Sequence, residues 1–325
     1  MRQPKVEIQF FARVFIFAVL FGFNSQVVMA KEESVVGNGA NFCTRTTNAA
    51  IKACSFEGAD KFWIAQGKCN NLSTQFERKK CLEEAGDAQS MKEMECKAQF
   101  EARLGVCKAV GEAPYDPKII PSMFVDPAEI GKSVKPNKCF PLIPGRSLIY
   151  KGGTETITVT VTTDTKEIEG VTCAVVRDVV ETEGEVKEDT TDWFAQDTQG
   201  NVWYFGEIVQ NLEDGELVNL AGSWKAGVNG AKIGIAMKAN PLVKGVYRQK
   251  LLLGEAEDVA KVLSVTASAQ AAAASCSADC MLTKDYTPIS PDKIEYKYYA
   301  PGIGFVLEVD PATGQRGVEL VEIKN

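Results

Sequence analysis

Residues 43–107 read CTRTTNAAIKACSFEGADKFWIAQGKCNNLSTQFERKKCLEEAGDAQSMKEMECKAQFEARLGVC and hold six of the chain's ten cysteines. The gaps between successive cysteines are 11, 15, 12, 15 and 11 residues, which is the same series in both directions. Such a palindrome is typical of an antiparallel hairpin centred near residue 75. Because about 11 residues make three helical turns and about 15 a little over four, each arm carries its cysteines on one stripe. We therefore predict a hairpin of two helices.

The hairpin also predicts the disulfide pairing. Six cysteines allow fifteen pairings. The nested one keeps every pair level, since helices packed roughly 8–10 Å apart bring facing Cα atoms within disulfide reach. Its bridges are Cys43–Cys107, Cys54–Cys96 and Cys69–Cys81. A break at Gly58 would create a third helix and permit Cys54–Cys69 instead. We expect Asn41 to cap the first helix and residues 70–73 to form the turn.

Four cysteines lie outside the hairpin, namely Cys139, Cys173, Cys276 and Cys280. We expect them to be oxidised as well. Cys276 and Cys280 are close enough to pair through a loop, although not within a regular strand, where four residues span about 13 Å. Cys139 would then pair with Cys173.

The N-terminal sequence explains why the chain contains so many cysteines. Arg2, Lys5 and Arg13 precede the apolar run 14–21, and small residues lead up to Ala30. This pattern predicts a secretory signal peptide over residues 1–30. Export allows disulfides to persist, so we expect a periplasmic or secreted protein. No later segment is long and apolar enough to predict a transmembrane helix.

Charge and composition exclude several classes of function. The formal charge is −7, and removing a segment with three basic residues and one acidic residue leaves −9. Such a chain is repelled by nucleic acid and by anionic lipid. The absence of histidine and of C-x-x-C pairs is unfavourable for histidine-based hydrolases, structural zinc and c-type haem. We therefore predict no metal and no cofactor.

Proline content divides the chain. Residues 31–110 contain none, whereas seven of the thirteen prolines fall between Pro114 and Pro144. We predict a helical hairpin over 31–110, a proline-rich linker over 111–146 and an antiparallel β domain over 147–325. About ten strands at regular spacing favour a meander that curls into an open or half barrel, in an α+β chain. Residues 267–275, rich in alanine, are expected to be irregular or a short helix.

Candidate site residues gather around residues 189–224. The aromatic candidates for a ligand groove are Trp193, Trp203, Phe205 and Trp224. Core packing explains them equally, because aromatic residues are favoured in strands. The acidic candidates are Asp189, Asp192, Asp197 and Glu207, of which two facing carboxylates would suit sugar chemistry. Since charged strand faces and turns also explain these acids, we assign no catalytic residue. An S-x-x-K match at 290–293 lies in a proline turn without its partner motifs.

Three segments resemble motifs of uncharacterised exported bacterial β-rich proteins. They are TDWFAQDTQGNVWYFGE at 191–207, KYYAPGIG at 297–304 and FPLIPG at 140–145. The resemblance covers about residues 111–325 and implies a recurrent exported domain. It implies no activity and no functional residue.

These observations favour an exported, non-enzymatic envelope protein. Its β domain would bind an apolar ligand or an envelope partner, and the disulfide-stapled hairpin would be attached to it. The alternatives are a carbohydrate-active enzyme with paired carboxylates near Asp192 and Glu207, and a purely structural or adhesive module.

Overall fold

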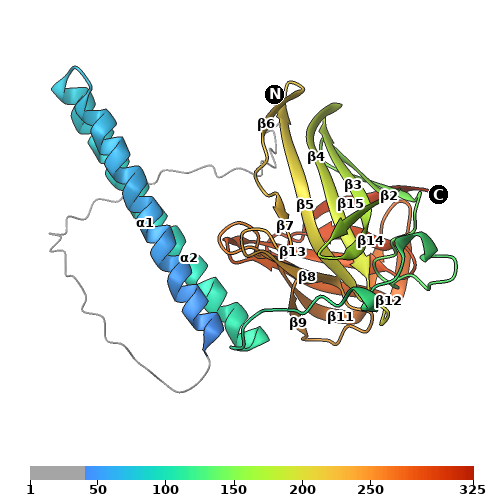
Figure 1. The fold of residues 1–325 in the computed structure, drawn as a ribbon. Helices are drawn as coiled ribbons and strands as arrows, with labels where there is room; N and C mark the ends of the chain where they lie inside the picture. The colour runs from blue at the N-terminus through green and yellow to red at the C-terminus, as the bar shows by residue number, and fades with distance from the viewer. Residues whose placement is uncertain (1–40) are drawn as a thin grey trace. The chain divides into compact units, whose positions relative to one another are not determined.

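The computed structural model describes residues 41–325. The predicted signal peptide lies outside the described residues. The described chain begins with two helices and continues into a large antiparallel sheet (Figure 1). The predicted fold class is therefore confirmed.

The helices are α1 (Phe42–Asn70) and α2 (Gln75–Val110), and they pack against each other as a hairpin. All three predicted bridges are present, with Cα–Cα distances of 5.6 Å for Cys43–Cys107, 5.7 Å for Cys54–Cys96 and 5.4 Å for Cys69–Cys81. α1 is continuous through Gly58, so no third helix forms. A Cβ at Gly58 would lie 3.0 Å from Lys92 Cγ, which shows how closely α2 approaches there.

The helix ends differ slightly from expectation. The Asn41 side chain makes no capping hydrogen bond. Instead, the carboxylate of Glu112 accepts hydrogen bonds from Thr44 N at 2.9 Å and Thr44 Oγ1 at 2.7 Å. A negative charge is favourable at a helix N-terminus, where free N–H groups point outward. α2 begins with a capping box between Thr74 and Glu77.

Two short 3₁₀ turns, η1 (Pro121–Met123) and η2 (Pro127–Glu129), interrupt the proline-rich segment. The strands are β1 (Ser147–Gly152), β2 (Glu155–Ile168), β3 (Val171–Thr182), β4 (Glu185–Gln196), β5 (Val202–Glu213), β6 (Glu216–Asn219), β7 (Trp224–Lys225), β8 (Lys232–Met237), β9 (Val246–Arg248), β10 (Lys250–Leu251), β11 (Val259–Gln270), β12 (Ser275–Thr287), β13 (Ser290–Ala300), β14 (Gly304–Val309) and β15 (Arg316–Lys324). Residues 267–270 continue β11 and Ser275 starts β12, so the irregular segment expected at 267–275 is confined to residues 271–274 and no helix forms there.

The sheet consists of two meanders joined side by side. β1 to β5 are neighbours in chain order, as are β11 to β15, and β1 pairs with β15. In that central pair Tyr150 lies opposite Leu320. The paired path begins at β10 and ends at β9, so the sheet is open. Its two edges nevertheless come close, because only Gln249 separates β9 from β10 in sequence and its backbone packs against Gly234 of β8.

The curled sheet has two different apolar faces. Val176 of β3, Val262 of β11 and Met281 of β12 share one core cluster. Residues from both meanders can meet in this way only on the concave side, which we call the interior. A second cluster contains Trp193, Phe205 and Ile233 from neighbouring strands and lies on the outer face.

The proline-rich segment packs against both faces. Ile130, Cys139 and Leu142 join the interior cluster, whereas Ile119 and Phe124 cover the outer one. The predicted linker is therefore more than a connection between domains, because it supplies part of the core.

Candidate functional site

The four aromatic candidates do not line one groove. Trp193 and Phe205 are buried in the outer cluster, with Trp203 packed against it. Trp224 lies in a separate cluster, and its indole Nε1 donates to Glu207 Oε1 at 2.8 Å. The structure therefore places Trp193, Phe205 and Trp224 in the core, whereas Trp203 is only partly buried, at the edge of a surface hollow.

Cys139 and Cys173 are buried free thiols, so the predicted bridge between them was wrong. Cys139 packs in the interior cluster and Cys173 in the outer one. The sheet separates them. Cys276 and Cys280 do form a disulfide, with a Cα–Cα distance of 5.5 Å. Both belong to β12, but a bulge with Ala278 at φ 58° shortens the strand between them.

The acidic candidates separate into three environments. Asp189 pairs with Arg177 on the solvent side of the sheet. Asp197 organises its own turn, because it accepts hydrogen bonds from Asn201 N at 2.9 Å and Trp203 Nε1 at 2.8 Å. Asp192 and Glu207 lie opposite each other on β4 and β5, and both are buried.

A bulge at Gly206 brings Glu207 to the interior. The register between β4 and β5 shifts so that Tyr204 lies opposite Phe194 while Glu207 lies opposite Asp192. Tyr204 and Glu207 then share a face, although strict alternation would separate them. A Cβ at Gly206 would come within 2.8 Å of Lys225 Cα, so glycine is needed there.

Internal donors satisfy this pair of carboxylates. The Tyr204 hydroxyl donates to Asp192 Oδ1. Lys250 Nζ lies 2.8 Å from Glu207 Oε1 and 3.0 Å from Asp258 Oδ2. Burial, reinforced by the charge of Glu207, raises the pKa of Asp192 well above its usual range. Asp192 and Glu207 with their donors thus form a buried, self-contained network.

The second meander adds a matching group of charges. Asp285 on β12 lies opposite Glu295 on β13, and Lys297 lies opposite Glu308 on β14. Lys297 Nζ forms an ion pair of 2.8 Å with Glu295 Oε2. Although burial disfavours its ammonium, Glu295 and Asp285 raise the pKa of Lys297.

The two groups meet across the interior. Burial raises the pKa of Asp178 on β3 to about 7, the charges of Glu188 and Glu207 add to this, and Lys297 of the other meander opposes it. Burial likewise raises the pKa of Glu308 to about 7. We call the combined set the interior acid cluster; it contains Asp178, Glu188, Asp192, Glu207, Asp285, Glu295 and Glu308 with Lys250 and Lys297.

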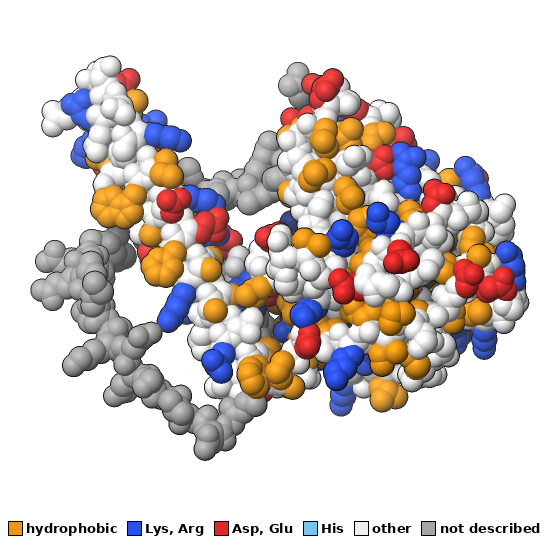
Figure 2. All heavy atoms as spheres, viewed as in Figure 1, with side chains coloured by type: hydrophobic (Ala, Val, Ile, Leu, Met, Phe, Trp, Pro, Cys, Tyr) orange, Lys and Arg blue, Asp and Glu red, His pale blue; other side chains and the backbone are white. Residues whose placement is uncertain are grey.

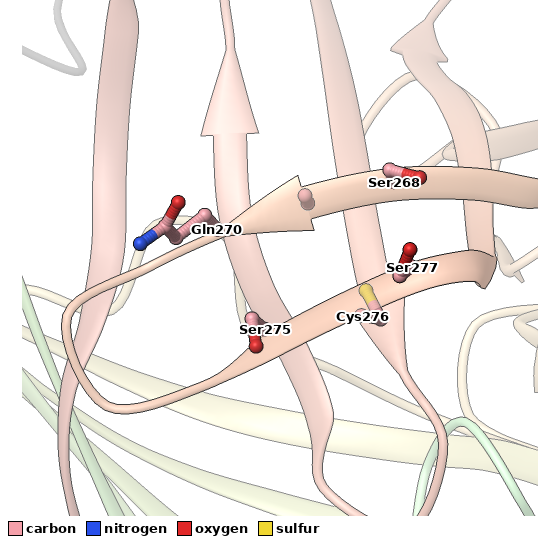
Figure 3. A pocket seen from close by; sticks show the side chains of 6 residues that line it. Ser268, Gln270, Ser275, Cys276 and Ser277 are labelled. Carbon is pink, nitrogen blue, oxygen red and sulfur yellow. The ribbon is translucent and has the colours of Figure 1, made fainter.

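Two surface hollows in the described residues lie elsewhere. One, of about 360 Å³, lies between the ends of β11 and β12 and is lined by Ser268, Ala269, Gln270, Ser275, Cys276 and Ser277 (Figure 3). Its only sulfur belongs to a disulfide and it has no titratable side chain, so it offers no catalytic group. The other, of about 240 Å³, includes Trp203 and Asp197, which already bond each other.

The hairpin carries an unusual surface. Phe42, Ala49, Phe56 and Trp63 recur every seven residues along α1 and are exposed. A heptad drifts by only about 20°, so these side chains form one stripe. The exposed fractions are 75% for Phe56 and 65% for Trp63. Cys54, which bonds α2, is buried on the opposite side. Apolar side chains are visible along the hairpin in Figure 2. We call these four residues the α1 stripe.

Among residues 41–325, no group of three acidic, cysteine or histidine side chains has an arrangement suited to a metal ion. No helix in the same range is long and apolar enough to cross a membrane. The four disulfides are typical of a protein that folds outside the reducing cytoplasm.

The described chain is thus an α+β protein with a stapled helical hairpin and an open antiparallel sheet. Comparisons with protein-family models, with curated proteins and with solved structures found no match. The resemblance to exported β-rich proteins stays a prediction.

Proposed function

We propose that this is an exported, non-enzymatic binding protein of the periplasm or the medium, and that the α1 stripe docks onto another envelope protein. The observation that carries the proposal is the exposure of Phe56 and Trp63 on a helix whose opposite side is fixed by disulfides. Contiguous exposed apolar surface marks interaction sites, and large aromatic side chains dominate binding energy at interfaces.

Charge suggests the nature of the partner. α1 contains four basic residues, Arg45, Lys52, Lys61 and Lys68, against Glu57 and Asp60, whereas the whole chain has a formal charge of −7. An apolar surface with acidic neighbours therefore fits the stripe best. An amphipathic helix has this chemistry, and its side-chain ridges pack well against a heptad stripe.

The disulfides favour binding, because they keep the hairpin in one conformation and so reduce the conformational entropy that it would lose on association. Bridges at both ends and in the middle hold α1 in a fixed rotation relative to α2. A surface held in its binding conformation before the encounter loses less freedom on association.

The carbohydrate-enzyme alternative gains little support. Asp192 and Glu207 do face each other, but Tyr204, Trp224 and Lys250 occupy them with internal hydrogen bonds. Neither surface hollow contains this pair.

The proposal is tested with the double substitution Phe56→Ser and Trp63→Ser. The matched control is Glu83→Ser with Asp87→Ser, which changes two exposed residues of α2. We expect native size separation of gently extracted protein to show a complex for wild type and control, and only free protein for the stripe variant. Equal complexes in all three would contradict the proposal. Loss of the complex together with flotation of purified wild type on anionic vesicles would instead assign the stripe to lipid.

A further inference from the structure

The hairpin formed by β5 and β6 carries a second exposed apolar surface. Its large apolar side chains are between 41% and 54% accessible, and they are Ile208, Leu217, Val218 and Leu220. Apolar side chains gather over this end of the sheet in Figure 2. We call these four residues the β-rim patch. Neighbouring exposed apolar side chains of this kind are typical of an interaction site.

The strand register brings the patch together on the outer face of the sheet. Glu207 faces the interior, so the next residue of β5, Ile208, faces outward. Leu212 lies four residues further on and shares that face, and Leu217 of β6 lies directly opposite it. Ile208 and Leu212 are about 13 Å apart along the strand. The apolar surface is therefore long enough for two aromatic side chains of a partner.

The surroundings of the β-rim patch are acidic. Residues 208–220 contain Glu213, Asp214 and Glu216 but no lysine or arginine, and all three acids are exposed. Lys187 of the neighbouring β4 lies near this turn, but its Nζ already forms an ion pair of 2.6 Å with Glu185 Oε2. The patch therefore combines apolar side chains with excess negative charge, and it calls for an apolar surface with basic neighbours.

The α1 stripe has these properties. Arg45 and Lys52 are exposed and follow stripe residues by three positions, so they lie beside the stripe on the helix surface. Phe56 and Trp63 are separated by seven residues, or about 10 Å along the helix axis. This spacing is close to the length of the apolar surface on β5. Stripe and patch thus match in polarity, in charge and in length.

Contacts between two identical surfaces are less favourable. Two β-rim patches face to face would bring Glu213, Asp214 and Glu216 of both molecules together. Two α1 stripes would do the same with Arg45 and Lys52. Like charges that meet at an interface are costly, whereas opposite charges favour association. A contact between the two unlike surfaces is therefore preferred.

We propose that the α1 stripe of one molecule packs on the β-rim patch of a second copy of this chain. The inference rests on the proposed docking role of the stripe and names its partner. Because stripe and patch are different surfaces, each molecule in a pair keeps one of each free. The association is therefore head to tail, and it produces an open chain or a closed ring of copies.

Sedimentation velocity of the purified exported chain tests the proposal. We expect the average mass of wild type to rise above that of one chain between about 1 and 100 μM. The stripe variant, Phe56→Ser with Trp63→Ser, should stay monomeric. The patch variant, Ile208→Thr with Leu217→Thr, should also stay monomeric, and threonine preserves the preference for a strand. Monomeric wild type over the whole range would overturn the proposal, as would a patch variant that associates normally.

The matched control is Leu242→Thr with Val243→Thr. These residues lie in the loop between β8 and β9 and are at least as exposed as most of the patch. The control should associate as wild type does. If it also became monomeric, exposed apolar surface in general would explain the association, and the assignment to the patch would be wrong.

A mixture of the two monomeric variants gives the sharpest result. The patch variant retains an intact stripe and the stripe variant retains an intact patch, so the two should form a dimer of one copy each. The dimer should not grow further, because its remaining surfaces are both disabled. A mixture without dimers would contradict the contact between stripe and patch. Circular dichroism checks that each variant is folded.

Charge exchange provides a second test that leaves the apolar residues in place. Arg45→Glu with Lys52→Glu should weaken association at least about tenfold, and so should Glu213→Lys with Glu216→Lys. The four substitutions in one chain exchange the signs of both surfaces and should restore association. A fourfold variant as weak as either double variant would contradict the charge pairing.

The failure of this inference differs from that of the proposed function. If purified wild type is monomeric while the stripe variant still loses its complex in gentle extracts, the partner is a different protein and the docking role of the stripe remains. If the extracted complexes are equal, the docking role itself is contradicted.

Discussion

Arg103 of α2 and Glu257, in the loop between β10 and β11, form a buried bidentate ion pair. Arg103 Nε lies 2.9 Å from Glu257 Oε2, and its Nη2 lies 2.7 Å from Oε1. The side chains are only 6% and 1% accessible. Glu257 also accepts a hydrogen bond from Gly254 N at 2.7 Å. The pair fixes the end of the hairpin to the β domain, so the two predicted domains are not connected by the chain alone.

Breaking this pair on one side should be costly. Arg103→Met leaves the Glu257 carboxylate buried without its cation, and we expect a loss of about 3–5 kcal/mol in the free energy of unfolding. Adding Glu257→Met removes the orphaned charge and should restore most of the lost free energy of unfolding. Urea denaturation of the two variants measures the difference. A single variant as stable as the double variant would show that burying the Glu257 carboxylate without its cation costs nothing.

The β domain should fold without the hairpin once the buried charge of Glu257 is removed. Residues 111–325 contain the whole sheet and the segment that packs on both its faces. We expect a fragment 111–325 with Glu257→Gln to unfold cooperatively, whereas the unsubstituted fragment should be less stable. Thermal scanning with circular dichroism is the measurement, and a broad, non-cooperative transition in the substituted fragment would count against a separate domain.

The disulfides should stabilise the hairpin locally. Cys54 and Cys96 are separated by 42 residues, and removing such a bridge costs about 2–4 kcal/mol through the freedom of the unfolded chain. In the Cys54→Ala, Cys96→Ala variant we expect faster amide exchange in the middle of α1 and α2. The control, Cys276→Ala with Cys280→Ala, should change exchange only near β11 and β12. Equal protection of the hairpin in both variants would refute the stapling role.

Stability should fall as the pH rises. Asp178 and Glu308 have folded-state pKa values raised to about 7 by burial, above the usual values of 3.8 and 4.5. The protonated forms therefore favour the folded state, so their contribution is complete below about pH 4 and is lost as the pH rises through about 7. Exposed ion pairs such as Lys61–Glu57 stabilise the folded state more as the pH rises, but their contribution is small.

We expect the free energy of unfolding to decrease by a few kcal/mol between about pH 4.5 and pH 8. Asp178→Asn with Glu308→Gln should flatten the curve and be more stable than wild type at the upper end. Denaturation at a series of pH values decides this, and a wild-type curve that rises with pH would show that these acids are ionised without penalty.

The hairpin was predictable because its information is local. Helix geometry converts the cysteine spacing into three level bridges, and the structure contains all three. The capping of the N-terminus of α1 was not predictable, because the group that binds Thr44 is Glu112, which lies 68 residues away in sequence.

Less of the candidate site than of the hairpin could be predicted from the sequence. A one-residue bulge at Gly206 places Glu207 on the face of Tyr204, which alternation alone would forbid. Of the interior acid cluster, the sequence indicated only Asp192 and Glu207, because the full set comes from two meanders that meet only when the sheet curls. The alternation of Glu295, Lys297 and Tyr299 on one strand was the available indication. Cys139 and Cys173 failed to pair because neighbouring positions on β3 face opposite sides of the sheet.

Site-specific cross-linking tests the docking role of the α1 stripe most directly. A photo-reactive benzoylphenylalanine replaces Trp63 in one protein and Lys97, an exposed residue of α2, in another. After irradiation of the producing cells, we predict a discrete protein adduct from position 63 that is lost when Phe56→Ser is added, and none from position 97. Equal adducts from both positions, or an adduct at 63 that is unaffected by Phe56→Ser, would contradict the account.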